Sequence, residues 1–360
     1  MENFDREIQM SLAEPQNVLL PSLLGYRCKS KGKKRKLAIV GAGRQWLGAS
    51  FYANDADPSF CLRIRTSEEL LNNPTVRQED EKNVNNISSV LRELSIRHNI
   101  DFFVDYHYED NALHLTERNI NIPGILMDWG GNTLASVLYP SDGNTLKPTI
   151  DQYAKMADDF MSICAKMKEM GIVHGDLSAN NITVTPDWKL KLIDYDSLYI
   201  PGRDVIHTEL SRGTNGYKHP GRVQAQRHTM SDDNFSQLVI YLSLLTYSVF
   251  PEMNNKKKES EELLFGTSQL ISITELRNSE QYNIIKSSGN QKLIFYLKEL
   301  EKAFDVPYDK VPFLCDLVYE SKEAAMPLTI FADYCGICGH HFENQTDLYC
   351  PDCGTKRVTL

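Results

Sequence analysis

The stretch GIVHGDLSANNITVTPDWKLKLIDYD, residues 171–196, constrains the fold and chemistry of this chain more than any other segment. Two short apolar segments, ITV and KLKLI, flank a proline and an aspartate, and this pattern predicts a β-hairpin. In an antiparallel hairpin, the residue before the first strand and the residue after the second lie at the same end. We therefore expect Asn181 and Asp194 side by side, with Asp176 one loop away.

One amide and two carboxylates gathered at one point suit the chemistry of phosphoryl transfer. Mg²⁺ prefers hard oxygen ligands and takes one or two from the protein, with phosphate and water completing its shell. Asn181 and Asp194 can serve that need, while Asp176, left off the metal, can accept the proton of an incoming hydroxyl. A hairpin with polar turn residues explains any one of the three, but it explains all three in this order poorly.

The stretch resembles the catalytic and metal-binding loops of the protein-kinase-like superfamily. HGDLSANN stands where HRDLKxxN is usual, and DYD stands where DFG is usual. GTNGYKHPGR (213–222) resembles the substrate-binding end of an activation segment, and DNFS (233–236) resembles the start of the buried helix that anchors the larger lobe. The chain is most similar to a bacterial branch of the eukaryotic-like Ser/Thr kinases with HGDL…N, LIDYD and YxHP. The resemblance covers about residues 35–250, and its second half is the more specific.

This resemblance implies an α+β, bilobal protein kinase-like fold, with a small antiparallel sheet lobe and a larger helical lobe. It also implies ATP and Mg²⁺ as cofactors. By resemblance, Asp176 is the catalytic base and Asn181 and Asp194 are the Mg²⁺ ligands. The gatekeeper and hinge that bind the nucleotide base would be Met127, Asp128 and Trp129.

The small lobe departs from the kinase pattern where phosphates should bind. A kinase glycine loop reads G-x-G-x-x-G, which lets backbone N–H groups approach the phosphates. Here GAGRQWLG supplies glycines at a wider spacing: Gly41, Gly43 and Gly48.

The third strand, FCLRIRT, has no lysine to grip the α- and β-phosphates. Arg63 takes the equivalent place, and its planar guanidinium can hold phosphate oxygens in another geometry. The helix partner of Arg63 would be Glu79, Glu81 or Glu93, and we favour Glu81.

The predicted activity is ATP/Mg²⁺-dependent transfer of a γ-phosphoryl group to Ser/Thr of a protein substrate. The missing lysine leaves open a nucleotide-binding pseudokinase scaffold. HGDxxxxN and IDxxD also occur in small-molecule phosphotransferases of the aminoglycoside and choline kinase type, although YKHPGR followed by DNFS argues against that class. Gly175 replaces the arginine that often pairs with a phosphorylated loop. Candidate autophosphorylation sites are Thr208, Ser211 and Thr214.

Periodicity places the elements around these motifs. The expected strands are Leu37–Val40, Ala49–Tyr52, Phe60–Arg65, Phe102–Tyr108 paired with Leu113–Arg118, and residues 124–129. The expected helices are residues 76–97, a helix from about 153 that closes at Gly171, residues 233–249 and residues 290–304. Residues 1–26 show no clear period. The domains would be an N-terminal extension (1–34), an N-lobe (35–130), a C-lobe (131–325) and a zinc ribbon (332–360).

Four cysteines near the C-terminus predict a metal site. Two C-x₂-C pairs form two tight knuckles, which together complete a tetrahedral S₄ site for structural Zn²⁺. The ligands would be Cys335, Cys338, Cys350 and Cys353. So short a ribbon has no core of its own, so metal binding should drive its folding. Protein docking or capping of a lobe is its expected role.

Composition limits the remaining possibilities. Apolar residues make up 41% and charged residues 24% of the 360 residues, as in ordinary globular proteins. The net charge of −9 argues against bulk nucleic-acid binding. The sequence has no long apolar run and no secretory signal, which favours a cytoplasmic protein without a membrane span. We expect a protein substrate or partner, and the sequence leaves the oligomeric state open.

Overall fold

The computed structural model divides into two compact units, residues 1–317 and 318–360, which are described separately. The structure describes residues 2–31, 37–38, 40–42, 46–53, 58–68, 73–140, 147–203, 213–255, 262–319, 334–335, 337–338, 340–342 and 347–357. The predicted end of the helical lobe at residue 325 and the predicted start of the ribbon at residue 332 lie outside these residues.

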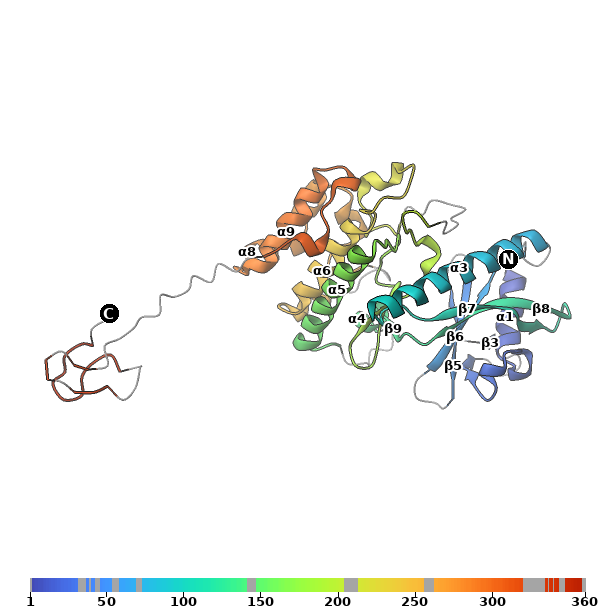
Figure 1. The fold of residues 1–360 in the computed structure, drawn as a ribbon, viewed down its shortest axis with the longest axis horizontal. Helices are drawn as coiled ribbons and strands as arrows, with labels where there is room; N and C mark the ends of the chain where they lie inside the picture. Colours follow the sequence, from blue (N-terminus) through green and yellow to red (C-terminus); the bar gives the residue numbers. More distant parts are fainter. Residues whose placement is uncertain are drawn as a thin grey trace. The chain divides into compact units, whose positions relative to one another are not determined.

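Residues 1–317 form two lobes, and the first of them is built on a six-stranded sheet (Figure 1). Its strands are β1 (Arg27–Cys28), β4 (Val40–Ala42), β5 (Trp46–Tyr52), β6 (Pro58–Arg65), β7 (Tyr106–Leu115) and β8 (Ile120–Asp128). The order is β1-β5-β6-β8-β7, β4 also pairs with β5, and every pairing is antiparallel. A separate small hairpin joins β2 (Ser30–Lys31) and β3 (Leu37–Ala38). The predicted small antiparallel lobe is confirmed.

One strand pairing differs from the sequence-based prediction. Residues 102–108 and 113–118 were expected to pair with each other, but a single strand, β7, runs through the polar segment between them and pairs with β8. The polar letters EDNA mark a shift of register between Glu109 and Leu113 rather than a turn. The turn follows β7, where Asn119 has a φ of 53°.

Two helices pack against this sheet. The helix α3 (Pro74–His98) contains the predicted helix, begins at the Asn73 cap and contacts β7. The helix α1 (Glu2–Leu12) lies in a segment where the sequence shows no clear period. Its residues Phe4, Ile8 and Leu12 are buried in the core of the sheet lobe. The N-terminal residues therefore complete this lobe.

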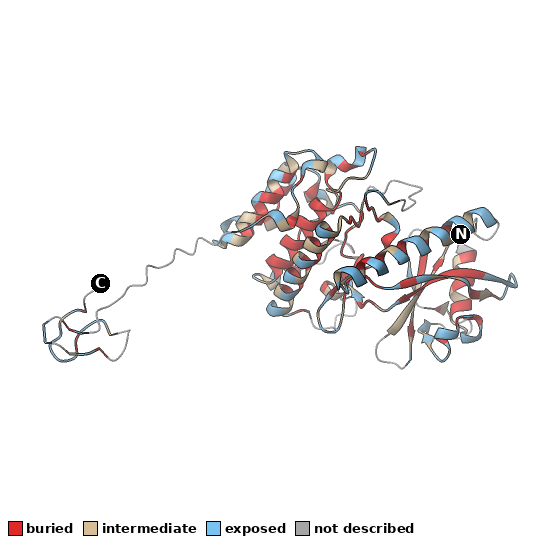
Figure 2. Ribbon diagram, in the orientation of Figure 1, coloured by how far each residue is buried: buried red, intermediate tan, exposed pale blue. Residues whose placement is uncertain are grey.

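The second lobe is helical. Its helices are α4 (Leu134–Leu138), α5 (Ile150–Met170), α6 (Asn234–Tyr247), α7 (Ile273–Asn278), α8 (Glu280–Ser287) and α9 (Gln291–Phe304). The helix α5 begins with a capping box of Thr149 and Gln152 and ends at Gly171, as predicted. Every residue of α6 is buried, and both α5 and α9 pack on it (Figure 2). The bilobal α+β architecture is thus the one predicted.

The predicted hairpin forms at the junction of the lobes. The strands β10 (Ile182–Val184) and β11 (Leu190–Leu192) pair antiparallel, and β9 (Asn132–Thr133) pairs with β10. Because Ile182 stands opposite Leu192, the residues just outside that pair share one end of the hairpin. Short 3-10 helices cover Pro15–Asn17, Pro21–Leu23, Tyr195–Ser197, Pro220–Gln224, Pro251–Asn255, Thr267–Leu270, Tyr308–Lys310 and Leu314–Asp316.

The second unit, residues 318–360, contains two isolated β-bridges, one between Tyr334 and His341 and one between Tyr349 and Lys356. Its small core consists of Cys335, Phe342 and Cys350. Across the described part of the chain, no helix is long and apolar enough to cross a membrane.

Candidate active site

The loop that carries Asp176 is fixed to the core of the helical lobe by Asp233. This aspartate precedes α6 and is 2% exposed. Its Oδ2 accepts a hydrogen bond from the His174 amide at 2.6 Å, and its Oδ1 accepts one from the Gly175 amide at 2.9 Å. Burial raises the pKa of Asp233, although these amides and nearby cationic side chains partly offset that rise. The first residue of DNFS therefore sets the position of the catalytic loop.

Gly175 is required by a close backbone approach. Its φ is 83°, and a Cβ atom at this position would lie 2.2 Å from the carbonyl oxygen of Ser197. The neighbouring His174 is fully buried, and its Nε2 lies 2.9 Å from the carbonyl oxygen of Ile193. Its Nδ1 faces the Asp176 amide at 3.4 Å, so the ring fits the tautomer with its proton on Nε2. Glycine at the usual arginine position thus has a steric cause.

Asn181 connects the catalytic loop with the strand that leads to Asp194. Its side-chain amide donates to the backbone carbonyl of Asp176 at 2.8 Å. The backbone carbonyl of Asn181 accepts a hydrogen bond from the Ile193 amide at 3.0 Å. Asp194 follows directly, with a φ of 69° in the left-handed region that aspartate tolerates better than most residues. The structure therefore brings the loops of Asp176, Asn181 and Asp194 to one region of the fold.

The carboxylate of Asp176 is held by Thr214. The Thr214 amide and the Thr214 hydroxyl each donate to Oδ1 of Asp176 at 2.7 Å. Within the described part of the chain, both hydrogen bonds to this carboxylate end on Oδ1, which leaves Oδ2 for another donor. Sequence reasoning missed this contact, because it joins segments 38 residues apart.

Arg63 pairs with Asp194. Its Nη2 lies 2.8 Å from Oδ1 of Asp194, and the two side chains are 15% and 36% exposed. Burial opposes the ionisation of Asp194, but the guanidinium of Arg63 outweighs it and holds the pKa of this carboxyl below its usual value. The guanidinium also lies 4.7 Å from the ring of Trp46. A cation and a candidate metal ligand are therefore direct neighbours.

Two of the predicted glycines stand in register with Arg63. Gly41 pairs with Gly48 across β4 and β5, and Gly48 pairs with Arg63 across β5 and β6. A Cβ atom at Gly48 would contact the side chains of Cys61 at 3.6 Å and Arg63 at 4.0 Å. Because Gly48 has no side chain, its backbone is uncovered on the face of the sheet that carries Arg63. Gly43 lies outside the described residues.

The prediction that Arg63 pairs with Glu81 of α3 is wrong, because Arg63 pairs with Asp194 and a different acid of α3 pairs with the sheet. The acid of α3 that pairs with the sheet is Asp80, and its partner is Arg65, with Nε and Oδ2 3.0 Å apart. Asp80 is buried, whereas Glu81 is half-buried and Glu79 is exposed. The rotation of α3 about its axis turns Asp80 toward the sheet. Arg63 is left to pair with Asp194 instead.

Tyr195 replaces the usual phenylalanine of the metal-binding loop and is fixed by its hydroxyl. The hydroxyl accepts a hydrogen bond from the Val104 amide at 2.8 Å and donates to the carbonyl of Leu192. Its ring stacks on Tyr106 with centroids 5.3 Å apart. Burial raises the pKa of Tyr195 well above its ordinary value, so the hydroxyl stays protonated. These contacts bind the metal-binding loop to the sheet lobe.

Asp196 replaces the usual glycine and forms a second link to that lobe. Its Oδ2 accepts a hydrogen bond from Nε1 of Trp46 at 3.2 Å. The residue keeps an exposed surface, but loss of hydration at its carboxylate and repulsion by Asp194 raise its pKa. The indole of Trp46 thus connects the start of β5 with the metal-binding loop.

The residues predicted as gatekeeper and hinge lie at the end of β8: Met127 and Asp128 are its last residues, and Trp129 follows it. Met127 is 5% exposed and pairs with Cys61 of β6. The Asp128 amide donates to the carbonyl of Asp105 at 3.0 Å, and the Trp129 amide donates to the carbonyl of Ser59 at 3.0 Å. These bonds hold the segment between the lobes against both neighbouring strands.

The segment YKHPGR contacts α9 through His219 and the catalytic loop through Arg222. Nε2 of His219 lies 2.9 Å from the carbonyl oxygen of Ala303 in α9. Arg222 is 3% exposed and donates to the carbonyl of Gly175 at 2.9 Å and to Asp232 at 3.2 Å. Sequence reasoning passed over Arg222 and Asp232, although a basic residue in GYKHPGR ahead of the acids in SDDN was a usable signal.

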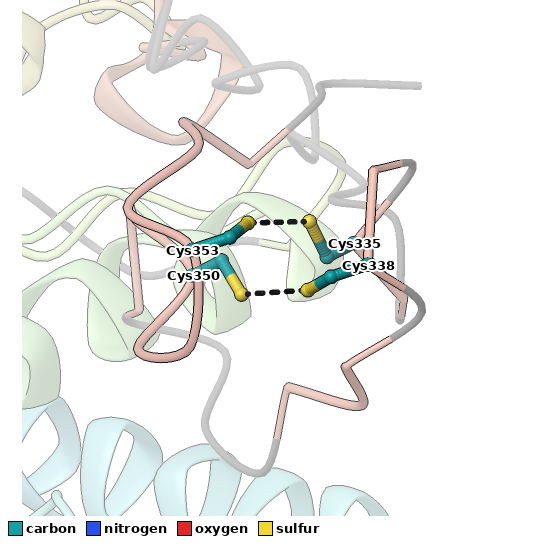
Figure 3. Close-up of side chains that lie close together, drawn as sticks. All are labelled: Cys335, Cys338, Cys350 and Cys353. Carbon is teal, nitrogen blue, oxygen red and sulfur yellow. Dashed lines mark hydrogen bonds between the residues drawn. The ribbon is translucent and has the colours of Figure 1, made fainter.

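The four C-terminal cysteines converge within the second unit. Their sulfur atoms all lie within 4.8 Å of one another, and Figure 3 shows them turned toward a common centre. The Sγ atoms of Cys335 and Cys353 are 3.6 Å apart, and those of Cys338 and Cys350 are 3.5 Å apart. A tetrahedral zinc site with Zn–S bonds of about 2.3 Å places its sulfurs about 3.8 Å apart. The cluster therefore has the size of an S₄ metal site.

Comparison with known proteins supports a kinase-like family. Residues 110–199, about a quarter of the chain, match the family model of the RIO domain, an atypical protein kinase family. This range contains Asp176, Asn181 and Asp194. The kinase PK-1 of the Cydia pomonella granulovirus resembles the chain with a TM-score of 0.45 and 15% identity, over 82% of this chain and 96% of that chain. No curated protein matches the chain.

The fold is a protein kinase-like fold. Its sheet lobe, its helical lobe and the hairpin between them have the arrangement that the sequence resemblance implied. The RIO-domain match supports a kinase-like phosphotransferase, and such a family implies the use of ATP and Mg²⁺.

Proposed function

We propose that residues 1–317 form an ATP- and Mg²⁺-dependent protein kinase that transfers the γ-phosphoryl group to Ser or Thr of a protein substrate. The contact between Asp176 and Thr214 carries this proposal. An aliphatic hydroxyl lies 2.7 Å from the carboxylate, so the surroundings of Asp176 admit a hydroxyl on a short side chain. The segment that supplies it is the one expected to face a protein substrate.

Asp176 is the proposed catalytic base. Thr214 occupies Oδ1 and fixes the carboxylate, so Oδ2 would orient the substrate hydroxyl and take its proton. As the new ester bond forms between the substrate oxygen and the γ-phosphorus, the bond from that phosphorus to the β,γ-bridging oxygen breaks and ADP leaves. The proton ends on Asp176.

Asn181 and Asp194 are the proposed Mg²⁺ ligands, because their oxygens are the hard donors that this ion prefers. Bound Mg²⁺ neutralises charge on the phosphates during transfer. Arg63 lies beside Asp194 and next to the bare backbone of Gly48, so its guanidinium suits phosphate oxygens. Gly41, Gly43 and Gly48 would cover the phosphates, and Met127, Asp128 and Trp129 would bind the base.

The ion pair between Arg63 and Asp194 favours one alternative, a nucleotide-binding pseudokinase scaffold. A cation bound to a metal-ligand carboxylate competes with Mg²⁺ for it. We favour activity because Asp176, Asn181 and Asp194 are all present around one loop system. A small-molecule phosphotransferase is less favoured, because Thr214 and the buried YKHPGR segment adjoin Asp176.

Autophosphorylation is part of the proposal, and Thr214, whose hydroxyl donates to the proposed base Asp176, is one candidate site. Thr208 and Ser211 lie outside the described residues and remain candidates.

We also propose that residues 334–357 form a zinc ribbon that holds structural Zn²⁺ through four thiolates. His340 pairs with Asp352 at 2.9 Å, and His341 contacts Tyr334 with the two rings tilted by 60°, so each histidine has a partner other than a metal ion. The ribbon would serve protein docking. We further propose a cytoplasmic protein that acts on or with other proteins.

Labelled ATP distinguishes these functions. Wild-type chain, Asp176→Asn and the control Asp187→Asn, an exposed aspartate of the hairpin turn, are incubated with ATP/Mg²⁺, generic protein substrates and aminoglycosides. We expect Asp176→Asn to slow label transfer to protein by about 10²–10⁴-fold while nucleotide binding persists. Asp187→Asn should behave like the wild type.

Each other outcome has a defined meaning. Equal transfer by wild type and Asp176→Asn would remove the base assignment. Label found on an aminoglycoside alone would favour the small-molecule enzyme, and nucleotide binding without any transfer would favour the scaffold.

A further inference from the structure

A cavity of about 280 Å³ opens on the side of the hinge that faces α3. Its walls come from the second half of α3, from residues 100–106, from residues 128–130 and from Lys191 of β11. Within the part of the chain that the structure describes, none of Arg63, Asp176, Asn181 and Asp194 lines it. We call it the α3–hinge groove, and its main lining residues are Leu91, Ile96, Phe103, Asp105, Asp128 and Trp129.

The groove combines apolar and charged walls. Leu91 and Phe103 are buried in its base, at 3% and 9% exposure, and Trp129 is half-buried. Ile96 lines the same groove and is 78% exposed. Exposed apolar residues beside a concave surface are typical of binding sites. The groove therefore offers contact area that the described chain does not cover.

The charges of the groove are unbalanced. Asp105 is bound to Arg92 through two contacts of 2.8 and 3.0 Å, and the Lys191 ammonium donates to the carbonyl of Asp101 at 2.7 Å. Asp128 adjoins Asp105 but makes no side-chain hydrogen bond or ion pair with any described residue. Asp128 is exposed, but partial loss of hydration and the charge of Asp105 raise its pKa, and His107 and Lys191 partly offset that rise. A cation next to Asp128 would stabilise its charged form against both the loss of hydration and the repulsion by Asp105.

We propose that the α3–hinge groove docks a segment of a partner protein that presents an arginine or lysine next to an aliphatic residue. The cation would pair with Asp128 and stack on the indole of Trp129, and the aliphatic side chain would cover Ile96 and Leu91. Arginine suits the groove best, because its planar guanidinium can bind a carboxylate and an aromatic face together.

The size of the groove supports a short side-chain motif. Small-molecule sites enclose about 300–1,000 Å³. The groove lies just below that range, which fits one or two amino-acid side chains better than a nucleotide. The inference does not rest on phosphoryl transfer, but it shares Asp128 and Trp129 with the proposed base-binding hinge. Binding is therefore measured without nucleotide.

The probe is a fluorescein-labelled peptide, Gly-Leu-Arg-Leu-Gly, and its matched version carries citrulline, the neutral isostere of arginine. Binding to the full chain without nucleotide is measured by fluorescence anisotropy. The variants are Asp128→Asn, Ile96→Asn and, as a control that removes the same charge elsewhere, Glu117→Gln at the exposed β7–β8 turn. Thermal unfolding of each variant confirms that it is folded.

We expect the arginine peptide to bind the wild type and the Glu117→Gln variant equally. Citrulline in the peptide, or Asp128→Asn in the chain, should each weaken binding about tenfold, as loss of one charged hydrogen bond predicts. Ile96→Asn should weaken the binding of both peptides.

Absence of binding to the wild type would overturn the proposal, and so would equal affinity for the two peptides or equal effects of Asp128→Asn and Glu117→Gln. Failure of the ATP assay would leave this result intact.

Discussion

Thr214 donates two hydrogen bonds to a single oxygen of Asp176, one from its amide and one from its hydroxyl, each 2.7 Å long. Thr214→Val keeps the shape of the side chain and the amide bond but removes the hydroxyl. We expect kcat to fall about tenfold, because a less well-oriented carboxylate is a poorer base. The KM for ATP should change little. Steady-state kinetics with a protein substrate measures both.

Thr214→Ser is the matched control, because it keeps the hydroxyl, and it should restore most of the rate. If Thr214 were instead a phosphate acceptor, mass spectrometry of the wild type after incubation with ATP would find phosphate on it. That result would contradict a positioning role.

Arg63 and Arg65 lie two residues apart on β6 and pair with different acids, Asp194 and Asp80. Arg63→Met should weaken Mg²⁺–ATP binding by about tenfold or more, because it removes the guanidinium proposed to bind phosphate oxygens. Arg63→Lys should retain part of the affinity, since it keeps the charge but loses the planar fork. Nucleotide titration followed by intrinsic fluorescence measures the change.

Arg65→Met provides the comparison on the same strand face. It leaves the buried Asp80 without its partner, so we expect a loss of about 1–3 kcal/mol in the free energy of unfolding. Nucleotide affinity should hold. A loss of affinity as large as that of Arg63→Met would show that the two arginines do not have separate roles.

Tyr195→Phe tests how the metal-binding loop is held. The hydroxyl joins the Val104 amide and the Leu192 carbonyl, and its removal leaves both buried groups unpaired. We expect a loss of about 1–3 kcal/mol in unfolding free energy. Hydrogen exchange at the Val104 amide should become faster.

Tyr199→Phe is the control, because the ring of Tyr199 stacks on His228 and no described residue forms a hydrogen bond with the Tyr199 hydroxyl. Unchanged exchange at Val104 would refute the link.

Much of this architecture follows from local sequence signals. The segments ITV and KLKLI bracket a turn, and the hairpin β10–β11 forms where they predict it. The helix α6 is apolar around most of its circumference and is buried at every position. Such signals survive folding because they depend on neighbours along the chain. The helix α1 also carries one, since Phe4, Ile8 and Leu12 are four residues apart, but the charged residues between them obscure it.

The remaining features depend on contacts between distant segments. One residue along a helix turns the side chain by about 100°, so the choice among Glu79, Asp80 and Glu81 rests on how α3 is rotated against the sheet. Composition cannot supply that rotation. The contact of Thr214 with Asp176 likewise requires the activation segment to return to the catalytic loop.

His219 makes stability depend on pH. Burial lowers the pKa of His219, and its ring bonds the carbonyl of Ala303. As pH falls below about 6.5, the unfolded chain takes up this proton before the folded chain does. The folded state therefore loses stability from about pH 6.5 down to the lowered pKa. His219→Gln can keep the bond to Ala303 without a titrating group, so its melting temperature should fall less between about pH 7.5 and pH 5.5.

Calorimetry at several pH values measures these differences. A wild type and a His219→Gln variant with the same pH dependence would assign the effect to another group.

The four cysteines predict one zinc ion per chain, since their sulfurs lie within 4.8 Å of one another and complete a closed S₄ set. Cys338→Ser or Cys353→Ser should abolish zinc binding, because three thiolates no longer enclose the ion. Cys315→Ser, in the other unit, should leave it unchanged. Metal analysis of the purified chains gives the count. Chelation should unfold the ribbon, because the core among its described residues is limited to Cys335, Phe342 and Cys350. It should leave the melting of residues 1–317 as it was, because that unit has its own core. Retention of zinc by the Cys353→Ser variant, or an equal loss in Cys315→Ser, would contradict the assignment of the ligands.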